Sequence, residues 1–184
     1  MTKIGTVYIR FFEGFDFKTI EVMAQVVLEQ LRQGTERFIF LMSSPGGNDM
    51  AGITGYNFLK GIPAEVITHN IGSVGSIAAV LFCAGSKRFC TPHSTFILHG
   101  ITLDVKAHST FNEKTLEERT SSVRADREIM SRVITDTTGN NYAQVERDIL
   151  EGIVLNSEQA LEYGLVHEIK TELFEKGAKV LEVT

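Results

Sequence analysis

The stretch "IGSVGSIAAVLFCAG", residues 71–85, places Ser73 and Ser76 among glycines directly before a run of small and apolar residues. The run "AEVIT" just upstream is apolar and β-branched, as is typical of a buried strand. Residues 78–83 then have the composition of a short buried helix. The segment therefore predicts a strand, a glycine-containing turn and a helix, with Ser73 in the turn and Ser76 at the start of the helix.

The same unit of strand, turn and helix occurs twice more in the first half of the chain. "TVYIRF" precedes residues 17–33, where apolar residues recur at helical spacing and Gly34 is a typical stop. "RFIFLM" leads through "SSPGG" to a second helix that is expected to begin near Met50. Because the strand segments are continuously apolar, they indicate strands buried on both faces. The sequence therefore predicts an α/β fold with a parallel sheet covered by helices.

A long helix is predicted at about residues 112–138, after two strand-like pieces, "KRFCTP" and "STFILHG". Thr115 followed by Glu118 suits a capping box near its start. Its narrow apolar stripe consists of Leu116, Val123, Met130, Val133 and Ile134. So thin a stripe is typical of a projecting helix that packs on another subunit, and equally of a solvated surface helix. With no linker or repeat array, residues 1–184 are predicted to form a single domain.

Composition and charge argue against several classes of protein. The 184 residues are 43% hydrophobic, carry a formal net charge of −5 and contain no Lys/Arg cluster, which disfavours a nucleic-acid or anionic-membrane surface. The first residues lack the apolar core of a secretory signal, and the longest mostly apolar stretch is too short to span a bilayer. We therefore expect a soluble, cytoplasmic protein.

Neither a metal ion nor a cofactor is expected. Cys83 and Cys90 have no metal-binding or redox spacing, so they are predicted to be reduced structural thiols. The five histidines include no pair at the spacing of metal ligands.

Three polar features follow predicted strands and should meet at one edge of the sheet, because ligands bind beyond the carboxyl ends of parallel strands. The glycine pair of "SSPGG" either holds an oxyanion with bare N–H groups or forms a tight turn. Ser76 is either a nucleophile favoured by the helix dipole or an N-terminal cap. His99, at the end of "TFILH", is either a general base or a structural histidine.

Together these segments resemble the ClpP family of serine peptidases, the proteolytic subunits of the Clp ATP-dependent protease. The similarity covers about residues 4–170, and its landmarks are "SSPGGNDMAG", "GSVGSIAAVLFCAGSKRFCTP", "STFILHG" and "QVERDILEGIVLNSEQALEYGLVHEI". The resemblance implies a ββα superhelix shared with the crotonase fold, in which residues 112–138 form a protruding handle helix. It also implies peptide or unfolded-protein substrates and a homo-oligomer of stacked rings, and it leaves open whether an AAA+ ATPase docks.

By the same resemblance, Ser76 is the nucleophile and His99 the base of a Ser-His-Asp triad. The backbone amides of Gly47 and Ile77 are implied to form the oxyanion hole. The triad aspartate, however, aligns with Gly152.

Three further departures from the family pattern are visible. Ile153 stands where the family has a basic residue that links the active site to ring contacts, and "HG" replaces the usual "HQP" after the histidine. The chain also begins almost at its first strand, so the segment that forms axial gating loops is expected to be missing.

The missing acid leaves several arrangements open, because the triad aspartate orients the imidazole and stabilises its charged form rather than making bonds. Glu151 or Asp148 could substitute for it, or Lys106 or Lys114 could form a Ser-Lys arrangement.

We therefore expect a ClpP-like serine endopeptidase that uses acyl-enzyme chemistry and is slow without its acid. Gly152 and Ile153 favour a second hypothesis, a non-catalytic ClpP-like scaffold subunit. A third is a crotonase-type enzyme acting on an acyl-CoA, which would use the paired amides without a serine nucleophile.

Overall fold

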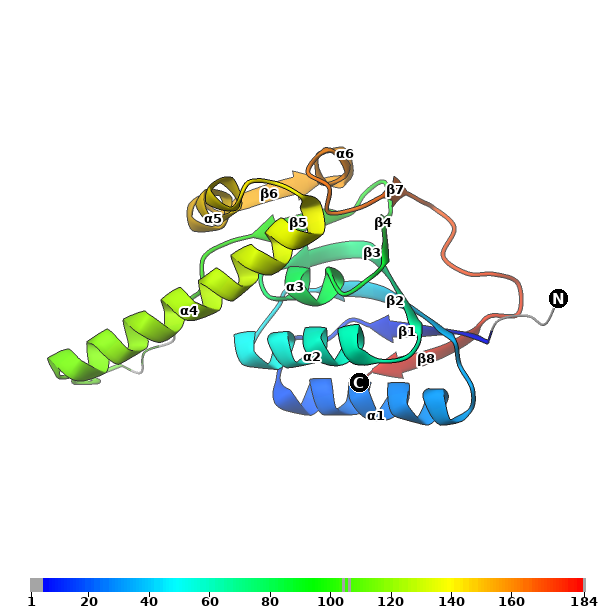
Figure 1. Ribbon diagram of the computed structural model, residues 1–184, viewed down its shortest axis with the longest axis horizontal. Coiled ribbons are helices and arrows are strands. Elements are labelled where there is room, and N and C mark those ends of the chain that lie inside the picture. The colour runs from blue at the N-terminus through cyan, green and yellow to red at the C-terminus, as the bar shows by residue number, and fades with distance from the viewer. Residues whose placement is uncertain (1–4, 104, 106, 184) are drawn as a thin grey trace.

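Eight strands form one mixed sheet in the computed structural model, which describes residues 5–103, 105 and 107–183 (Figure 1). The strands are β1 (Thr6–Phe11), β2 (Arg37–Ser44), β3 (Glu65–Gly75), β4 (Lys87–Cys90), β5 (Thr95–Leu98), β6 (Ile153–Asn156), β7 (Glu168–Ile169) and β8 (Lys179–Val183). Their order is β6-β5-β3-β2-β1-β8, and β4 pairs with β3 and β7. Every pair is parallel except β5 with β6, so the predicted parallel sheet is confirmed for most of its strands.

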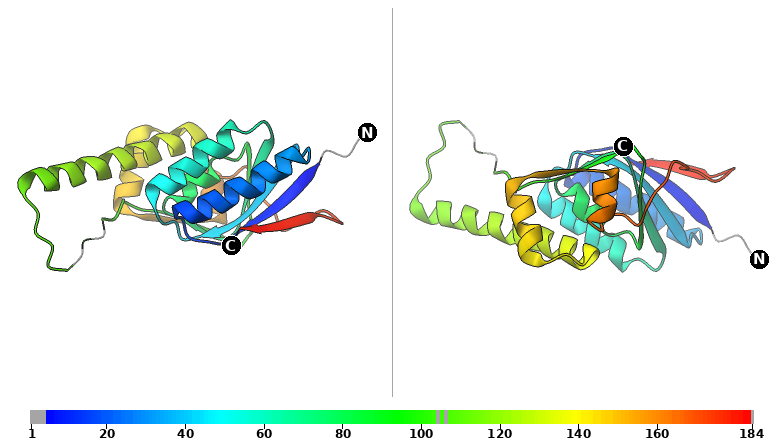
Figure 2. Two further views of the ribbon diagram at one scale, coloured as in Figure 1. Left: turned by 90° about the horizontal axis from the view of Figure 1, so that it is seen from below. Right: turned by 90° about the horizontal axis from the view of Figure 1, so that it is seen from above.

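The helices alternate with the strands in the first half of the chain, as predicted. They are α1 (Phe17–Arg32), α2 (Asp49–Gly61), α3 (Ala78–Phe82), α4 (Glu113–Thr138), α5 (Tyr142–Glu151) and α6 (Ser157–Glu162). The three helices α1, α2 and α3 lie next to one another along one face of the sheet (Figure 2). The predicted start near Met50 and the stop at Gly34, whose φ is +84°, are both confirmed.

The third strand is longer than the sequence predicted, because it changes partners halfway. Residues 67–70 of β3 pair with β4, whereas residues 73–75 pair with β5. Ser73 therefore lies on a strand and not in a turn, which corrects the prediction. Its hydroxyl accepts a hydrogen bond from Thr95 Oγ1 at 3.2 Å, and its N–H donates to Ser43 Oγ at 3.3 Å.

The core lies between the sheet and its helices. Phe82 of α3 meets Phe96 of β5 edge-on, with ring centroids 5.0 Å apart. Cys83 and Cys90 are both free and buried, as predicted. Burial raises the pKa of the Cys83 thiol to about 11, so this thiol is protonated and unreactive at neutral pH.

The long helix α4 projects from the body of the molecule (Figure 1). Its C-terminal part packs on α5 and α3 through the fully buried Met130 and Ile134, whereas Leu116 near its other end is 51% exposed. The predicted capping box was wrong, because Asn112 is the N-cap and its side chain accepts from the Thr115 N–H at 2.9 Å. Asparagine is among the best N-caps, and it leaves no such role for Thr115.

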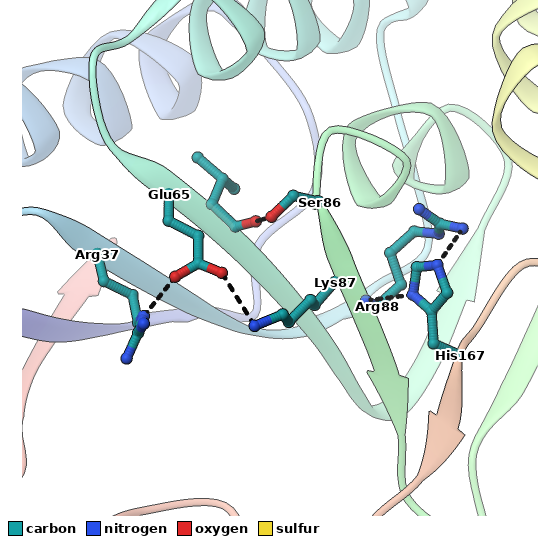
Figure 3. Close-up of polar contacts among 7 residues, drawn as sticks. Arg37, Glu65, Ser86, Lys87, Arg88 and His167 are labelled. Carbon is teal, nitrogen blue, oxygen red and sulfur yellow. Dashed lines mark hydrogen bonds and ion pairs between the residues drawn. The ribbon is translucent and has the colours of Figure 1, made fainter.

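A buried arginine ties the C-terminal half of the chain to β4. Arg88 donates to the backbone carbonyls of Leu165 at 2.8 Å, Gly85 at 3.2 Å and Gly164 at 3.3 Å. Its own N–H donates to His167 Nδ1 at 3.0 Å (Figure 3). These bonds satisfy carbonyls that would otherwise be buried without a donor.

Candidate active site

The carboxyl ends of β2, β3 and β5 bring three predicted site segments to one edge of the sheet. Gly75 is the register partner of Ile97, and the Ser76 N–H donates to the Ile97 carbonyl at 2.8 Å. Ser76 therefore leaves β3 beside the strand that ends one residue before His99. Gly46 follows β2 on the other side and lies directly against Ser76.

Ser76 has a strained backbone between a strand and a helix. Its φ is +54°, in the left-handed region that non-glycine residues rarely adopt, and the residue is 9% exposed. The N-cap of α3 is Ile77, and no side chain caps this helix. Ser76 is therefore not the helix cap that sequence reasoning weighed against a nucleophile. Strain of this kind at a strand-to-helix turn also presents the nucleophile of other hydrolases.

The backbone N–H groups of Gly47 and Ile77 lie beside Ser76. Neither has a hydrogen-bond acceptor within the described residues. Gly47 is held by a parallel bridge to Phe15, in which Phe15 N–H donates to Gly46 O at 2.8 Å and Asn48 N–H donates to Phe15 O at 2.7 Å. The bridge fixes the backbone of Gly47 without using its own N–H. Gly47 and Ser76 line one hollow of about 410 Å³. Free, fixed N–H groups beside a nucleophile are the elements of an oxyanion hole.

His99 has a backbone acceptor where a triad would have a carboxylate. Its Nδ1 lies 2.7 Å from the Gly100 carbonyl oxygen. Because a carbonyl only accepts, Nδ1 carries the proton, and in the neutral ring Nε2 is left as the acceptor. This is the tautomer that a general base acting through Nε2 requires.

No hydrogen bond joins Ser76 to His99 in the part of the chain that the structure describes. His99 lines a neighbouring hollow of about 350 Å³ with Ser73, Gly75 and Ile97 rather than the hollow of Ser76. The structure thus brings the two residues to the same edge of the sheet without pairing them. Catalytic hydrogen bonds often tighten only when substrate binds.

Gly152 lies beside His99, where the resemblance aligned the absent aspartate. A Cβ added to Gly152 would lie 3.8 Å from His99 Cβ, with no other atom of the described residues within 4 Å apart from its own chain neighbours. Gly152 is the C-cap of α5 with φ +77° and ψ 93°, a conformation that favours glycine. The position is therefore next to the histidine but contributes no side chain.

Where the structure describes them, neither carboxylate proposed as a substitute for the acid, Asp148 or Glu151, forms a hydrogen bond or ion pair with His99, and Lys114 forms none with Ser76. The Asp148 carboxylate accepts from Gln144 Nε2 at 2.7 Å and from the Tyr163 hydroxyl at 2.8 Å. Burial, then this bond to Asp148, raises the pKa of Tyr163. Glu151 is exposed, and Lys114 is an exposed partner of Glu118 at 3.8 Å. Lys106 lies outside the described residues.

Sequence reasoning missed one charged residue in the Ser76 hollow, Asp49. It is the first residue of α2 and lines the hollow together with Asn48 and Thr102. Burial, then the charge of Asp126, raises the pKa of Asp49, and the positive charge of protonated His99 opposes this shift. The signal that could have found it is its position two residues after Gly47, inside the predicted oxyanion-hole turn.

No group of three or more His, Cys, Asp or Glu able to hold a metal occurs within the described ranges.

The first evidence for the class of protein is the comparison of its fold with a known structure. The structure of a ClpP1 mutant from Listeria monocytogenes matches this one with a TM-score of 0.80, covering 92% of each chain at 23% sequence identity. The chain therefore has the mixed α/β fold of ClpP, as the sequence motifs predicted.

The family follows from the sequence comparison: the Clp protease family model matches residues 13–172, and the chain belongs to this family. The ATP-dependent Clp protease proteolytic subunit 3 of Synechococcus sp. (strain CC9605) is 26% identical over 150 residues, which are 80% of this chain and 74% of that protein. Subunit 1 of Tropheryma whipplei (strain Twist) is 29% identical over 157 residues, 84% of this chain and 74% of that protein. Among the described helices, none is both long and apolar enough to cross a membrane.

Proposed function

We propose that this chain is a ClpP-like serine endopeptidase that cleaves peptides within a homo-oligomeric ring by acyl-enzyme chemistry. The observation that carries the proposal is the strained Ser76, which lines a hollow with Gly47 and is followed by Ile77, whose N–H group, like that of Gly47, lacks an acceptor among the described residues. A purely structural turn has no need of a strained serine and two unused donors in one place. The family membership supports the same chemistry.

The proposed reaction begins with attack of Ser76 Oγ on the peptide carbonyl carbon while His99 Nε2 takes the hydroxyl proton. The carbonyl oxygen becomes an oxyanion that accepts from the Gly47 and Ile77 N–H groups. When the C–N bond breaks, His99 returns the proton to the leaving amine, and an acyl-Ser76 ester remains. Water then attacks the ester with His99 again as base, which releases the acid product and regenerates Ser76.

The Gly100 carbonyl keeps the proton on His99 Nδ1 in this mechanism. A neutral carbonyl stabilises the imidazolium less than a carboxylate does, so we expect slow turnover. In trypsin-like enzymes, replacing the triad aspartate by its amide lowers kcat by about 10⁴-fold.

Assembly is proposed to use the projecting part of α4. Leu116 and Ile129 are exposed apolar residues on this helix, at 51% and 37% exposure. Burial of such side chains against a second copy is favourable by about 25 cal/mol per Å². Light scattering should show an oligomer at micromolar concentration. Leu116→Glu should shift it towards the monomer.

A non-catalytic scaffold subunit is the second candidate function, and the absence of a side chain at Gly152 favours it. Labelling by a fluorophosphonate separates the two, because the reagent reacts with an activated serine. We expect labelling of the wild type that is lost in Ser76→Ala and His99→Ala and retained in Ser73→Ala. Absence of labelling in the wild type would instead support the scaffold.

A further inference from the structure

Asp49, which carries a carboxylate, lines the same hollow as Ser76. Asp49 begins α2 directly after the turn that carries Gly47, and it lines the hollow of about 410 Å³ with Ser76 and Thr102. An acyl group attached to Ser76, with its oxygen held by the Gly47 amide, would therefore have its own side chain beside this carboxylate.

Asp49 lies in the first turn of α2, where a negative charge is favourable for the helix dipole, but it does not cap the helix. The N-cap of α2 is Asn48, whose side chain accepts from the Ala51 N–H at 2.9 Å. Within the described residues, the Asp49 carboxylate makes no hydrogen bond or ion pair, although it is partly buried. A half-buried carboxylate without a partner is unfavourable by itself, and a bound cation would offset that cost.

The electrostatic surroundings of Asp49 also favour a cationic ligand. Burial and the like charge of Asp126 raise the Asp49 pKa, and His99 is the opposing positive group. A ligand cation would counter both unfavourable effects at once, whereas an apolar side chain would increase the burial of the carboxylate.

We propose that Asp49 is a specificity-determining residue that selects arginine or lysine on the acyl side of the scissile bond. A guanidinium can pair with the carboxylate through two parallel hydrogen bonds, which adds orientation to the charge attraction. The proposal rests on the proposed peptidase function, because it assigns a substrate class to the Ser76 hollow.

The substrate test uses two fluorogenic peptides that differ only in having arginine or its neutral isostere citrulline before the scissile bond. We expect wild-type kcat/KM to be at least tenfold higher for arginine, and the ratio to fall close to one in Asp49→Asn. Asp16→Asn is the matched control, since Asp16 is another carboxylate at a helix N-terminus but does not line the Ser76 hollow. The ratio of kcat/KM for the arginine peptide to that for the citrulline peptide should be the same in Asp16→Asn as in the wild type.

A binding test keeps this proposal separate from the proposed catalysis. Fluorescent 4-aminobenzamidine is an arginine mimic that is not hydrolysed, and its binding to the full chain requires no turnover. We expect saturable binding by the wild type and Asp16→Asn, and at least tenfold weaker binding by Asp49→Asn. Equal binding by wild type and Asp49→Asn, absence of binding, or an arginine-to-citrulline ratio near one in the wild type overturns the proposal. Failure of fluorophosphonate labelling, by contrast, overturns the peptidase function and leaves the benzamidine result to decide the ligand class.

Discussion

Gly46 packs against Ser76 so closely that a Cβ on Gly46 would lie 2.7 Å from Ser76 Cβ and 2.8 Å from the Gly75 carbonyl oxygen. The φ of Gly46 is +98°, which a side chain would also strain. The turn after β2 and the turn after β3 therefore fit together only when Gly46 has no side chain.

Gly46→Ala should consequently separate the two turns and disable Ser76. We expect loss of fluorophosphonate labelling and a loss of about 1–3 kcal/mol in the free energy of unfolding, as for other overpacked sites. Urea unfolding measures the second quantity. Gly61→Ala is the control, because a Cβ there meets nothing within 4 Å among the described residues. Full labelling of Gly46→Ala would show that the two turns need not touch.

Local pattern was sufficient to predict the first three strands and helices. Each unit carries its own signal, since continuous apolar runs mark buried strands and helical spacing marks α1. Gly34 and Asn112 bound their helices through local backbone and side-chain chemistry. The strand β8 had no comparable signal, because residues 179–183 are largely exposed and pair with β1 across almost the whole length of the chain.

Only those parts of the site that belong to sequence motifs could be predicted. Ser76 and His99 each follow a predicted strand, and the carboxyl ends of parallel strands meet at one edge of a sheet. The acceptor for His99 is the carbonyl of Gly100, which no side-chain pattern can reveal. The role of Asp49 depends on a hollow formed by α2, the β3 turn and Thr102, which are far apart in the sequence.

Among the arginines, replacing Arg88 is expected to lower the free energy of unfolding most. Arg88→Ala would leave the buried carbonyls of Leu165 and Gly85 without this donor, and each buried unsatisfied group costs about 1–3 kcal/mol. We therefore expect a loss of at least about 2 kcal/mol, measured by urea unfolding, and incomplete recovery in Arg88→Lys, whose ammonium lacks the planar fork.

Arg37→Ala is the matched control for Arg88. Arg37 is paired with Glu65 at 2.6 Å in a partly exposed site (Figure 3). Such pairs contribute at most about 1 kcal/mol. Equal losses for the two alanine variants would contradict the role given to the Arg88 hydrogen bonds.

Stability should fall as the pH drops below about 6.5, because of His69. Burial lowers the pKa of His69, whose Nε2 donates to the Lys170 carbonyl at 3.3 Å. Burial, then the charge of Arg88, lowers the pKa of His167 as well. The unfolded chain thus binds protons first, and stability that is fully present above about pH 6.5 is lost as the pH falls. The slope cannot exceed about 1.4 kcal/mol per pH unit for each proton.

Thermal unfolding across this range measures the effect. His69→Gln should flatten the dependence in part and His93→Gln, at an exposed position, should leave it unchanged. Asp49 and Asp126 have raised pKa values and act in the opposite direction. An unchanged slope in His69→Gln would assign the pH dependence to other groups.

The last prediction concerns Gly152, which lies beside His99 without a side chain to accept its Nδ1 proton. An aspartate fits the space, because its Cβ would be in ordinary contact with His99 Cβ at 3.8 Å. The φ of +77° opposes it, and a strained non-glycine residue costs about 1–3 kcal/mol of stability. If the carboxylate replaces the Gly100 carbonyl as the partner of His99, Gly152→Asp should raise peptide turnover at least tenfold, or about 1.4 kcal/mol of barrier, while lowering the melting temperature.

Gly152→Asn is the control that isolates the charge, since its shape and backbone strain match those of Gly152→Asp. Its melting temperature should fall by a similar amount, and its turnover should stay near that of the wild type. Equal turnover in the two variants would show that the carboxylate does not act on His99. Loss of wild-type activity in Glu151→Gln would instead identify Glu151 as the acid. A further outcome is that turnover and fluorophosphonate labelling stay at background in the wild type, in Gly152→Asp and in Ser76→Ala with every peptide. The subunit is then a scaffold, because adding the missing carboxylate has not produced activity.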